Sequence, residues 1–189
     1  FRSGNSTVSV LGPTINGSGN NNSLVLRVVY GQTSFLLTGD AEFEEERYML
    51  NSGQELSSTV LKVGHHGSDS STSAQFLNAV MPQYAVISVG TDNAYGHPSQ
   101  AVLDNFKQFN VDVFRTDLQG DVICSSNGQS VSFTVEKNKD ADTLSTVYQD
   151  PVLRVFPFDT QPENIEADNI DYVLNTNTKK YHYPDCSSV

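Results

Sequence analysis

Residues 33–68 read TSFLLTGDAEFEEERYMLNSGQELSSTVLKVGHHGS, and this stretch decides the fold. Two short apolar runs, at 33–37 and 59–63, flank a segment with acidic residues near its start and Gly53 at its end. That segment predicts a helix, with Asp40 as its N-cap, because Asp is among the preferred capping residues. A buried strand, a helix and a second buried strand predict an α/β layered protein.

The same alternation of apolar runs and amphipathic segments continues on both sides of this stretch. Phe43, Arg47 and Leu50 recur at three- and four-residue spacing, which predicts the packed face of the first helix. Residues 12–22 (GPTINGSGNNN) predict a loop without regular structure. Further strands are expected at 8–11, 24–30, 84–89, 111–115, 121–124 and 131–135, and further helices at 72–80 and 98–109.

The composition changes after about residue 135, where Lys, Asp, Thr and Pro replace the apolar alternation. A length of 189 residues fits one core with an appendage. We therefore expect a first domain at 1–135, a linker at 136–170 with one short strand at 152–156, and the start of a small C-terminal module at 171–189.

The charge balance of the chain restricts its partners. With 11 basic and 22 acidic residues the formal net charge is −11, so no broad basic face is available to hold a nucleic-acid backbone. Tight, nonspecific nucleic-acid binding by this chain alone is therefore not expected. No apolar run approaches the roughly 20 residues that a membrane span needs, so no span is expected in this chain.

Three predicted strands are followed by loops that carry acid–base or metal-ligand side chains: Asp40, the pair His65-His66, and His97. Sites in layered α/β proteins form at strand ends, so we expect these loops to form one site. Each residue also has a purely structural interpretation. Asp40 and His97 could cap the helices that follow them, whereas two histidines between glycines are unusual for packing because both rings need polar partners.

The motifs NNNSLVLRVVYGQTSFLLTGD (20–40), LKVGHHGS (61–68) and YGHPS (95–99), in this order, resemble the C-terminal half of the metallo-β-lactamase-fold hydrolases. They are specifically similar to the soluble domain of the DNA-uptake channel protein ComEC and its stand-alone bacterial relatives, over about residues 8–135. The resemblance implies the C-terminal portion of an αββα sandwich. It also implies a site where two metals activate a water for attack on a phosphodiester, possible substrates being DNA or another phosphodiester.

The resemblance also implies roles for individual residues. Asp40 matches the carboxylate that bridges both metals, and His65 matches the last metal ligand, with His66 as the second choice. His97 matches a catalytic residue that contacts a phosphate oxygen or donates a proton to the leaving group. Carboxylate and imidazole ligands suit Zn²⁺ or Mn²⁺, so either metal is expected. ComEC-like domains lie outside the cytoplasm, which implies an extracytoplasmic or secreted location.

One departure from the family pattern limits what this chain can do alone. The family carries an HxHxDH or HxDxDH signature and a further histidine upstream, but this sequence has no histidine before His65. The metal site is therefore incomplete, and we expect the chain to be inactive by itself. Either the N-terminal half belongs to a longer parent enzyme, or the chain is a noncatalytic binding or scaffold module. Half a sandwich would expose an apolar sheet face, which predicts self-association or association with the missing half.

The end of the chain carries a second, shorter resemblance. Residues 172–186 follow the pattern YxxNxNxKxxHxPxC, which is similar to a small module of secreted bacterial nucleases and to part of the metal-binding region of the Ada methyl-repair proteins. His182 and Cys186 could share a metal, or the segment could be a β-hairpin with a buried thiol. Lys179 and Lys180 form an adjacent basic pair that could contact DNA.

Overall fold

A computed structural model of the chain describes residues 2–14, 19–146, 173–175 and 180–182. The chain divides into two compact units, Phe1–Tyr148 and Gln149–Val189. In the second unit, β10 (Val173–Asn175) pairs antiparallel with β11 (Lys180–His182), so a C-terminal hairpin is present. The strand expected at 152–156, the thiol of Cys186 and the backbone of Lys179 lie outside the described residues.

Seven strands of the first unit form one sheet whose spatial order follows the chain. The strands up to β4 pair antiparallel, whereas β4 to β7 pair parallel. Parallel neighbours need crossover connections, which the helices supply. The strands are β1 (Arg2–Ser3), β2 (Ser6–Gly12), β3 (Val25–Tyr30), β4 (Thr33–Leu37), β5 (Val60–Lys62), β6 (Tyr84–Ile87) and β7 (Asp112–Arg115).

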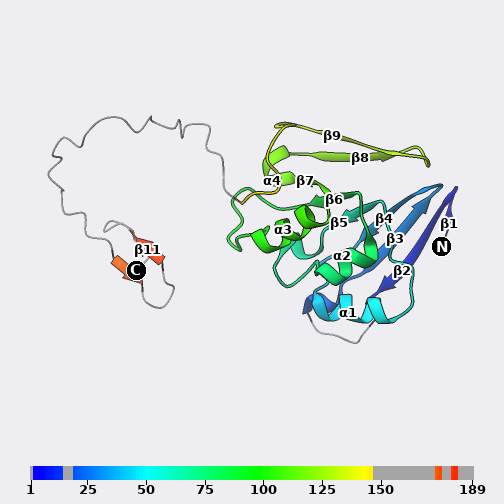
Figure 1. Cartoon of the computed structure of the whole chain (residues 1–189), viewed down its shortest axis with the longest axis horizontal. Coiled ribbons are helices and arrows are strands. Elements are labelled where there is room, and N and C mark those ends of the chain that lie inside the picture. The colour runs from blue at the N-terminus through cyan, green and yellow to red at the C-terminus, as the bar shows by residue number, and fades with distance from the viewer. Residues whose placement is uncertain (1, 15–18, 147–172, 176–179, 183–189) are drawn as a thin grey trace. The chain divides into compact units, whose positions relative to one another are not determined.

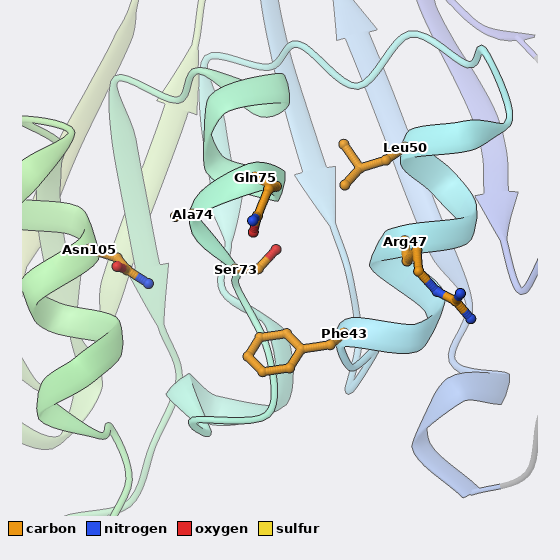
Figure 2. Close-up of a pocket in the computed structure, with 7 residues that line it drawn as sticks. All are labelled: Phe43, Arg47, Leu50, Ser73, Ala74, Gln75 and Asn105. Carbon is orange, nitrogen blue, oxygen red and sulfur yellow. The ribbon is translucent and has the colours of Figure 1, made fainter.

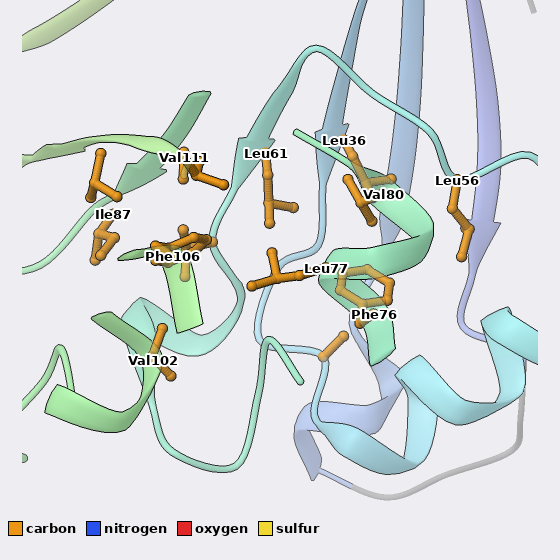
Figure 3. Close-up of a cluster of buried hydrophobic side chains, with 14 of the residues drawn as sticks. Leu36, Leu56, Leu61, Phe76, Leu77, Val80, Ile87, Val102, Phe106 and Val111 are labelled. Atoms are coloured by element: carbon orange, nitrogen blue, oxygen red, sulfur yellow. The ribbon is translucent and has the colours of Figure 1, made fainter. Parts of the chain in front are cut away.

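Three helices pack on one face of this sheet (Figure 1): α1 (Phe43–Asn51), α2 (Ala74–Val80) and α3 (Gln100–Gln108). Ser73 and Ser99 cap α2 and α3, because their hydroxyl oxygens accept hydrogen bonds from the backbone N–H groups of Phe76 and Val102. The core lies between sheet and helices (Figure 3), and its fully buried side chains include Leu36, Leu61, Phe76, Leu77, Ile87 and Phe106. The predicted α/β class is confirmed.

The other face of the sheet is only partly covered. A hairpin of β8 (Val122–Ser126) and β9 (Val131–Val135) lies over it, and the Phe133 ring stacks on Phe114 with centroids 4.1 Å apart. The backbone N–H of Gln32 donates to the carbonyl of Gly128, which ties the hairpin tip to the β3–β4 turn. The short helix α4 (Thr116–Gln119) connects β7 to this hairpin.

A row of apolar side chains runs across the uncovered part of this face. Strand register places Val10 beside Leu26 and Leu26 beside Leu37. Lys62 follows Leu37 in this row and separates it from Val86. Val10 is 59% exposed and Leu37 is 39% exposed. The sheet therefore presents an apolar surface on the side opposite the helices.

The packed face of α1 differs from the predicted one. Phe43, Arg47 and Leu50 line a groove between α1 and α2 (Figure 2). Leu50 packs against the core as predicted, whereas Phe43 is 47% exposed. The buried side chains are instead Met49 and two carboxylates, Glu45 and Glu46. These carboxylates are buried because they bind remote backbone groups: Glu46 accepts from the N–H groups of Thr72 and Ser73, and Glu45 accepts from Thr14.

No helix in the described residues is long and apolar enough to cross a membrane.

Candidate functional site

Backbone hydrogen bonds join the three loops that were expected to form a site. The N–H of His65 donates to the carbonyl of Gly39 at 3.0 Å, and the N–H of Ser99 donates to the carbonyl of Gly67 at 2.9 Å. The loops follow β4, β5 and β6, which are parallel neighbours, so their carboxyl ends share one edge of the sheet. The structure therefore brings Asp40, the histidine pair and the His97 loop together.

The histidine turn, η2 (Gly64–Gly67), holds an unfavourable backbone conformation. His65 has φ 46° and His66 has φ 56°, both in the left-handed region that residues other than glycine rarely adopt. Such strain costs on the order of 1–3 kcal/mol per residue and concentrates at functional sites. Gly67 has φ 84°, and a Cβ there would lie 2.6 Å from Pro98, so only glycine lets the two loops approach this closely.

His66 faces Asp40, and the backbone carbonyl of Ser88 determines which ring nitrogen of His66 carries the proton. Its Nδ1 lies 2.7 Å from the carbonyl oxygen of Ser88, and because a carbonyl only accepts, Nδ1 carries the proton. In the neutral ring, Nε2 then carries a lone pair, and this atom lies 3.6 Å from Oδ1 of Asp40. Both atoms can accept a hydrogen bond or bind a metal, so a cation or a proton between them is favourable.

The donor set at Asp40 and His66 suits a divalent transition metal, because one carboxylate oxygen and one imidazole nitrogen converge. The carbonyl that holds Nδ1 of His66 is the kind of supporting contact that metal-ligating histidines make. Two ligands are fewer than the three or more that a protein metal site needs. Within the described part of the chain, no group of three or more His, Cys, Asp or Glu side chains is arranged to hold a metal.

The interpretation of Asp40 as a helix N-cap is wrong. The N-cap position of α1 is Glu42, and no side chain of its own caps the helix there. Asp40 instead belongs to the preceding turn, where Gly39 has φ 56° and the N–H of Asp40 donates to the hydroxyl of Ser23. This turn leaves the Asp40 carboxylate free to face His66.

His65 belongs to a second polar cluster, with Glu42, Asn20 and Ser70. Its Nδ1 lies 3.2 Å from Oε1 of Glu42, and its Nε2 lies 3.4 Å from Nδ2 of Asn20. The same Asn20 nitrogen donates to Glu42 at 3.2 Å, which fixes the orientation of the amide because a carboxylate only accepts. Asn20 therefore donates to Nε2, and the neutral His65 ring carries its proton on Nδ1.

The carboxylate of Glu42 remains ionised in this cluster. Burial raises its pKa, but hydrogen bonds from Asn20 and Ser70 and the nearby His65 ring outweigh burial, so the pKa of Glu42 lies below the ordinary value. The charge on Glu42 favours the Nδ1–H form of His65. Glu42 thus orients the His65 ring in the way that carboxylates orient metal-ligating histidines.

The role of Glu42 and the contacts of Asn20, Asn21 and Ser23 were not predicted from the sequence. The turn η1 (Gly19–Asn22) lies inside the segment that was predicted to be an irregular loop. Oδ1 of Asn21 accepts hydrogen bonds from the N–H groups of Glu42 and Glu45, so it caps α1 from outside the helix. The run of asparagines was the only signal, because Asn side chains readily satisfy nearby backbone groups.

Replacing Asn21 by Ala is expected to destabilise the chain by about 1 kcal/mol, within the 0.5–2 kcal/mol of a lost helix cap. The N–H groups of Glu42 and Glu45 lose their acceptor in this variant. Denaturant unfolding followed by circular dichroism measures the effect. Asn22→Ala is the matched control, because Asn22 is exposed; equal stability of the two variants would contradict the capping role.

His97 lies beside the histidine pair and is not a helix cap, since Ser99 occupies that position in α3. Asn93 holds its backbone: Oδ1 of Asn93 accepts from the His97 N–H, and Nδ2 donates to the His97 carbonyl. The His97 ring packs edge-on against His65 with centroids 5.6 Å apart. It stacks on Tyr95 with centroids 5.9 Å apart and 16° between the ring planes.

The surroundings of His97 disfavour its charged form. Burial lowers the pKa of His97 below the ordinary value of 6.5, and the neighbouring rings of His65 and His66 lower it further, whereas Asp69 opposes them. A lowered pKa means that the proton leaves at a lower pH, so His97 is mainly neutral at pH 7.

An NMR titration of the four histidines is expected to give His97 a midpoint below 6.5. Replacing His65 by Gln removes a repelling neighbour and should raise that midpoint while leaving it below the ordinary value, because burial remains. The assignment comes from a His97→Gln sample. A midpoint at or above 6.5 in the unaltered chain would contradict this description of the site.

The site also contains a half-buried lysine and a cavity. Burial lowers the pKa of Lys62, and the charge of nearby Asp40 opposes this in part. Nζ of Lys62 donates to the carbonyl of Val63. A cavity of about 200 Å³ opens beside the histidines, lined by His66, Val89, Gly90, Asn93, Tyr95 and His97. The groove between α1 and α2, of about 590 Å³, is separate and is lined by neither histidine nor carboxylate (Figure 2).

No family model and no solved structure matches the chain. Several curated proteins are similar to it, among them the following three. ComE operon protein 3 of Bacillus subtilis is 38% identical over 128 residues, which is 68% of this chain and 16% of that protein. Competence protein ComA of Neisseria gonorrhoeae is 47% identical over 102 residues, covering 53% of this chain and 15% of that protein.

The third, Recombination protein 2 of Haemophilus influenzae, is 38% identical over 103 residues, covering 54% of this chain and 13% of that protein. The chain therefore spans about one-sixth or less of the length of these curated relatives. The predicted relationship to competence proteins is confirmed.

Proposed function

We propose that this chain supplies half of the active site of a metal-dependent phosphodiesterase or nuclease that acts in DNA uptake. The observation that carries the proposal is the convergence of Oδ1 of Asp40 and Nε2 of His66, 3.6 Å apart, beside a strained turn at the carboxyl edge of a parallel sheet. The relationship to competence proteins supports a role in DNA uptake. An extracytoplasmic or secreted location is part of the same proposal.

The proposal places the chain in the C-terminal part of a metallo-β-lactamase αββα sandwich. Its helices cover one face of the sheet, and the other face carries the exposed apolar row that includes Val10 and Leu37. A second sheet that packs on this row would bury it and would carry further ligands toward Asp40. A second copy of the chain is the other occupant that could cover the same surface.

Asp40 and His66 would hold the cation, Zn²⁺ or Mn²⁺, and further ligands would come from the other half. Two cations at such a site would supply the charge that activates a water for attack on a phosphodiester.

The other two histidines of the site have different roles. Glu42 and Asn20 orient the ring of His65. His65 lies between the turn that carries Asp40 and the ring of His97. Neutral His97 keeps one N–H, which can donate a hydrogen bond to a phosphate oxygen. Its lowered pKa makes this role more favourable at pH 7 than proton donation.

A noncatalytic binding or scaffold module is the second candidate function. It is favoured by one observation: within the described residues, the donors at Asp40 and His66 have no third ligand. Under this alternative the fold and the histidine turn persist without a metal, and the chain acts through binding alone.

A nuclease assay separates the two candidates. The chain alone and a longer product that includes the coding sequence before Phe1 are each incubated with linear DNA and Zn²⁺ or Mn²⁺. We expect cleavage by the longer product only, and its loss with a chelator. His97→Ala in the longer product should lower turnover while the metal content stays the same. A longer product that binds metal and cleaves no phosphodiester would contradict the proposal.

A further inference from the structure

The aromatic ring of Tyr95 is unusually open to solvent. Tyr95 is 84% exposed, more than any other large apolar side chain that the structure describes. One part of its ring stacks on His97, at 5.9 Å and 16°. The high exposure leaves most of the ring uncovered, so a flat platform stands directly beside the proposed reaction site.

The cavity beside Tyr95 can accept a flat ring but offers little else to bind it. Its volume of about 200 Å³ is below the roughly 300–1,000 Å³ of a typical ligand pocket. Val89 and Gly90 give it an apolar wall. The amide of Asn93 already binds the backbone of His97 and Gly90, and Nδ1 of His66 binds Ser88.

From this geometry we propose that the cavity binds one nucleobase of single-stranded DNA, stacked against the ring of Tyr95. The inference rests on the proposed function, because it specifies single-stranded DNA as the substrate of that site. A base stacked on Tyr95 in this cavity lies beside His66 and His97, which line the same cavity. Because the nearby amide is already hydrogen-bonded, the edge of the base is not read, and all four bases should bind similarly.

Single-stranded DNA fits this site better than a duplex. Bases in a duplex already stack on their neighbours, whereas an unpaired base has a free face for an aromatic side chain. Stacking of this kind contributes about 5- to 150-fold in affinity per base. None of the described residues that line the cavity is Lys or Arg, and the chain carries a net charge of −11. Binding should therefore depend only weakly on salt.

The test measures binding of fluorescein-labelled dT10 to the chain of residues 1–189 by fluorescence anisotropy, without added metal. Tyr95→Ala should weaken binding about 5- to 150-fold, whereas Tyr95→Phe should keep it within about 3-fold because the ring remains. Tyr48→Ala is the matched control, since Tyr48 is an exposed tyrosine of α1, 43% accessible and outside the cavity. An abasic decamer and a duplex of equal length should bind more weakly than dT10.

Several results would overturn the inference: no binding of dT10, unchanged binding by Tyr95→Ala, or equal binding of the abasic decamer. A steep fall of the logarithm of the binding constant with the logarithm of the salt concentration would also overturn it. Each phosphate contact contributes about 0.7 to that slope, so a slope of several times 0.7 would mean binding through phosphates. Failure of the proposed function looks different. If dT10 binds through Tyr95 but the longer product cleaves no DNA, the stacking site stands and the hydrolase does not. If the longer product cleaves DNA and Tyr95→Ala leaves its KM unchanged, the reverse holds.

Discussion

Replacing Asp40 by Asn in the longer product is expected to lower phosphodiester hydrolysis by at least about 100-fold, a barrier increase of nearly 3 kcal/mol. The change removes the negative charge that faces Nε2 of His66 at 3.6 Å, and with it the attraction for a cation. Thermal stability should stay nearly the same. The hydrogen bond from the backbone N–H of Asp40 to the hydroxyl oxygen of Ser23 is retained. The side chain of Asp40 is 44% exposed, so its replacement disturbs little packing.

The matched control for this variant is Asp112→Asn. Asp112 is an exposed aspartate at the first residue of β7, the end of the strand away from the site. Both variants remove one negative charge, so any general electrostatic effect appears in both. Hydrolysis by Asp40→Asn within a few-fold of the unaltered protein would contradict the role of Asp40.

Replacing Asp117 by Ala is expected to destabilise the chain by about 3–5 kcal/mol, the usual effect of leaving a buried charge without its partner. Arg115 and Asp117 are each about 3% exposed in their side chains, and Nη2 of Arg115 lies 2.6 Å from Oδ2 of Asp117. Nε of Arg115 donates to the other carboxylate oxygen. Without Asp117 the guanidinium stays buried and uncompensated.

This ion pair also holds the segment after β9 beside the His97 loop. Nη1 of Arg115 donates to the carbonyls of Thr143 and Ser145, and Oε1 of Gln100 accepts from the N–H of Thr146. Residues 143–146, which were expected to be linker, therefore pack on the first unit. Loss of Asp117 should expose this segment, so limited proteolysis after Lys137 or Lys139 should become faster.

Denaturant unfolding measures the Asp117→Ala effect. Asp121→Ala, at an exposed aspartate four residues later, should change stability by no more than about 0.5 kcal/mol. The double variant Arg115→Met with Asp117→Leu should lose less stability than Asp117→Ala, because no charge is left buried. A loss below about 1 kcal/mol in Asp117→Ala would contradict the burial argument.

The local features of the chain were predictable from sequence because they depend on neighbouring residues. Apolar runs and turn residues located the β3–β4 hairpin and the strands that end at Asp40 and at the His65 turn. Parallel pairing then places the ends of those strands at one edge. The convergence of the candidate residues followed from this topology, without knowledge of side-chain positions.

The long-range features were not predictable in the same way. The burial of Glu45 and Glu46 was not predicted, because carboxylates are rarely buried without partners. Their partners, Thr14 and Thr72, lie 31 and 26 residues away in sequence, so periodicity alone could not indicate which carboxylates of α1 are buried. Asn20 likewise reaches His65 across 45 residues.

The choice between His65 and His66 as the partner of Asp40 also depended on three-dimensional detail. Sequence analysis favoured His65 because it is nearer to the end of β5. In the structure the left-handed turn points the two rings in different directions, so that His65 faces Glu42 and His66 faces Asp40. Consecutive left-handed residues other than glycine are too rare for a sequence pattern to indicate.

Metal content, measured by elemental analysis of the longer product after gel filtration, tests the central claim most directly. The comparison is between the unaltered protein, His66→Gln and His65→Gln, all in a Cys186→Ser background that removes the thiol of the C-terminal segment as a ligand. We expect bound Zn²⁺ or Mn²⁺ in the unaltered protein and at least one equivalent fewer in His66→Gln, with a smaller loss in His65→Gln. Full metal content in His66→Gln, or none in the unaltered protein, would contradict a cation held between Asp40 and His66.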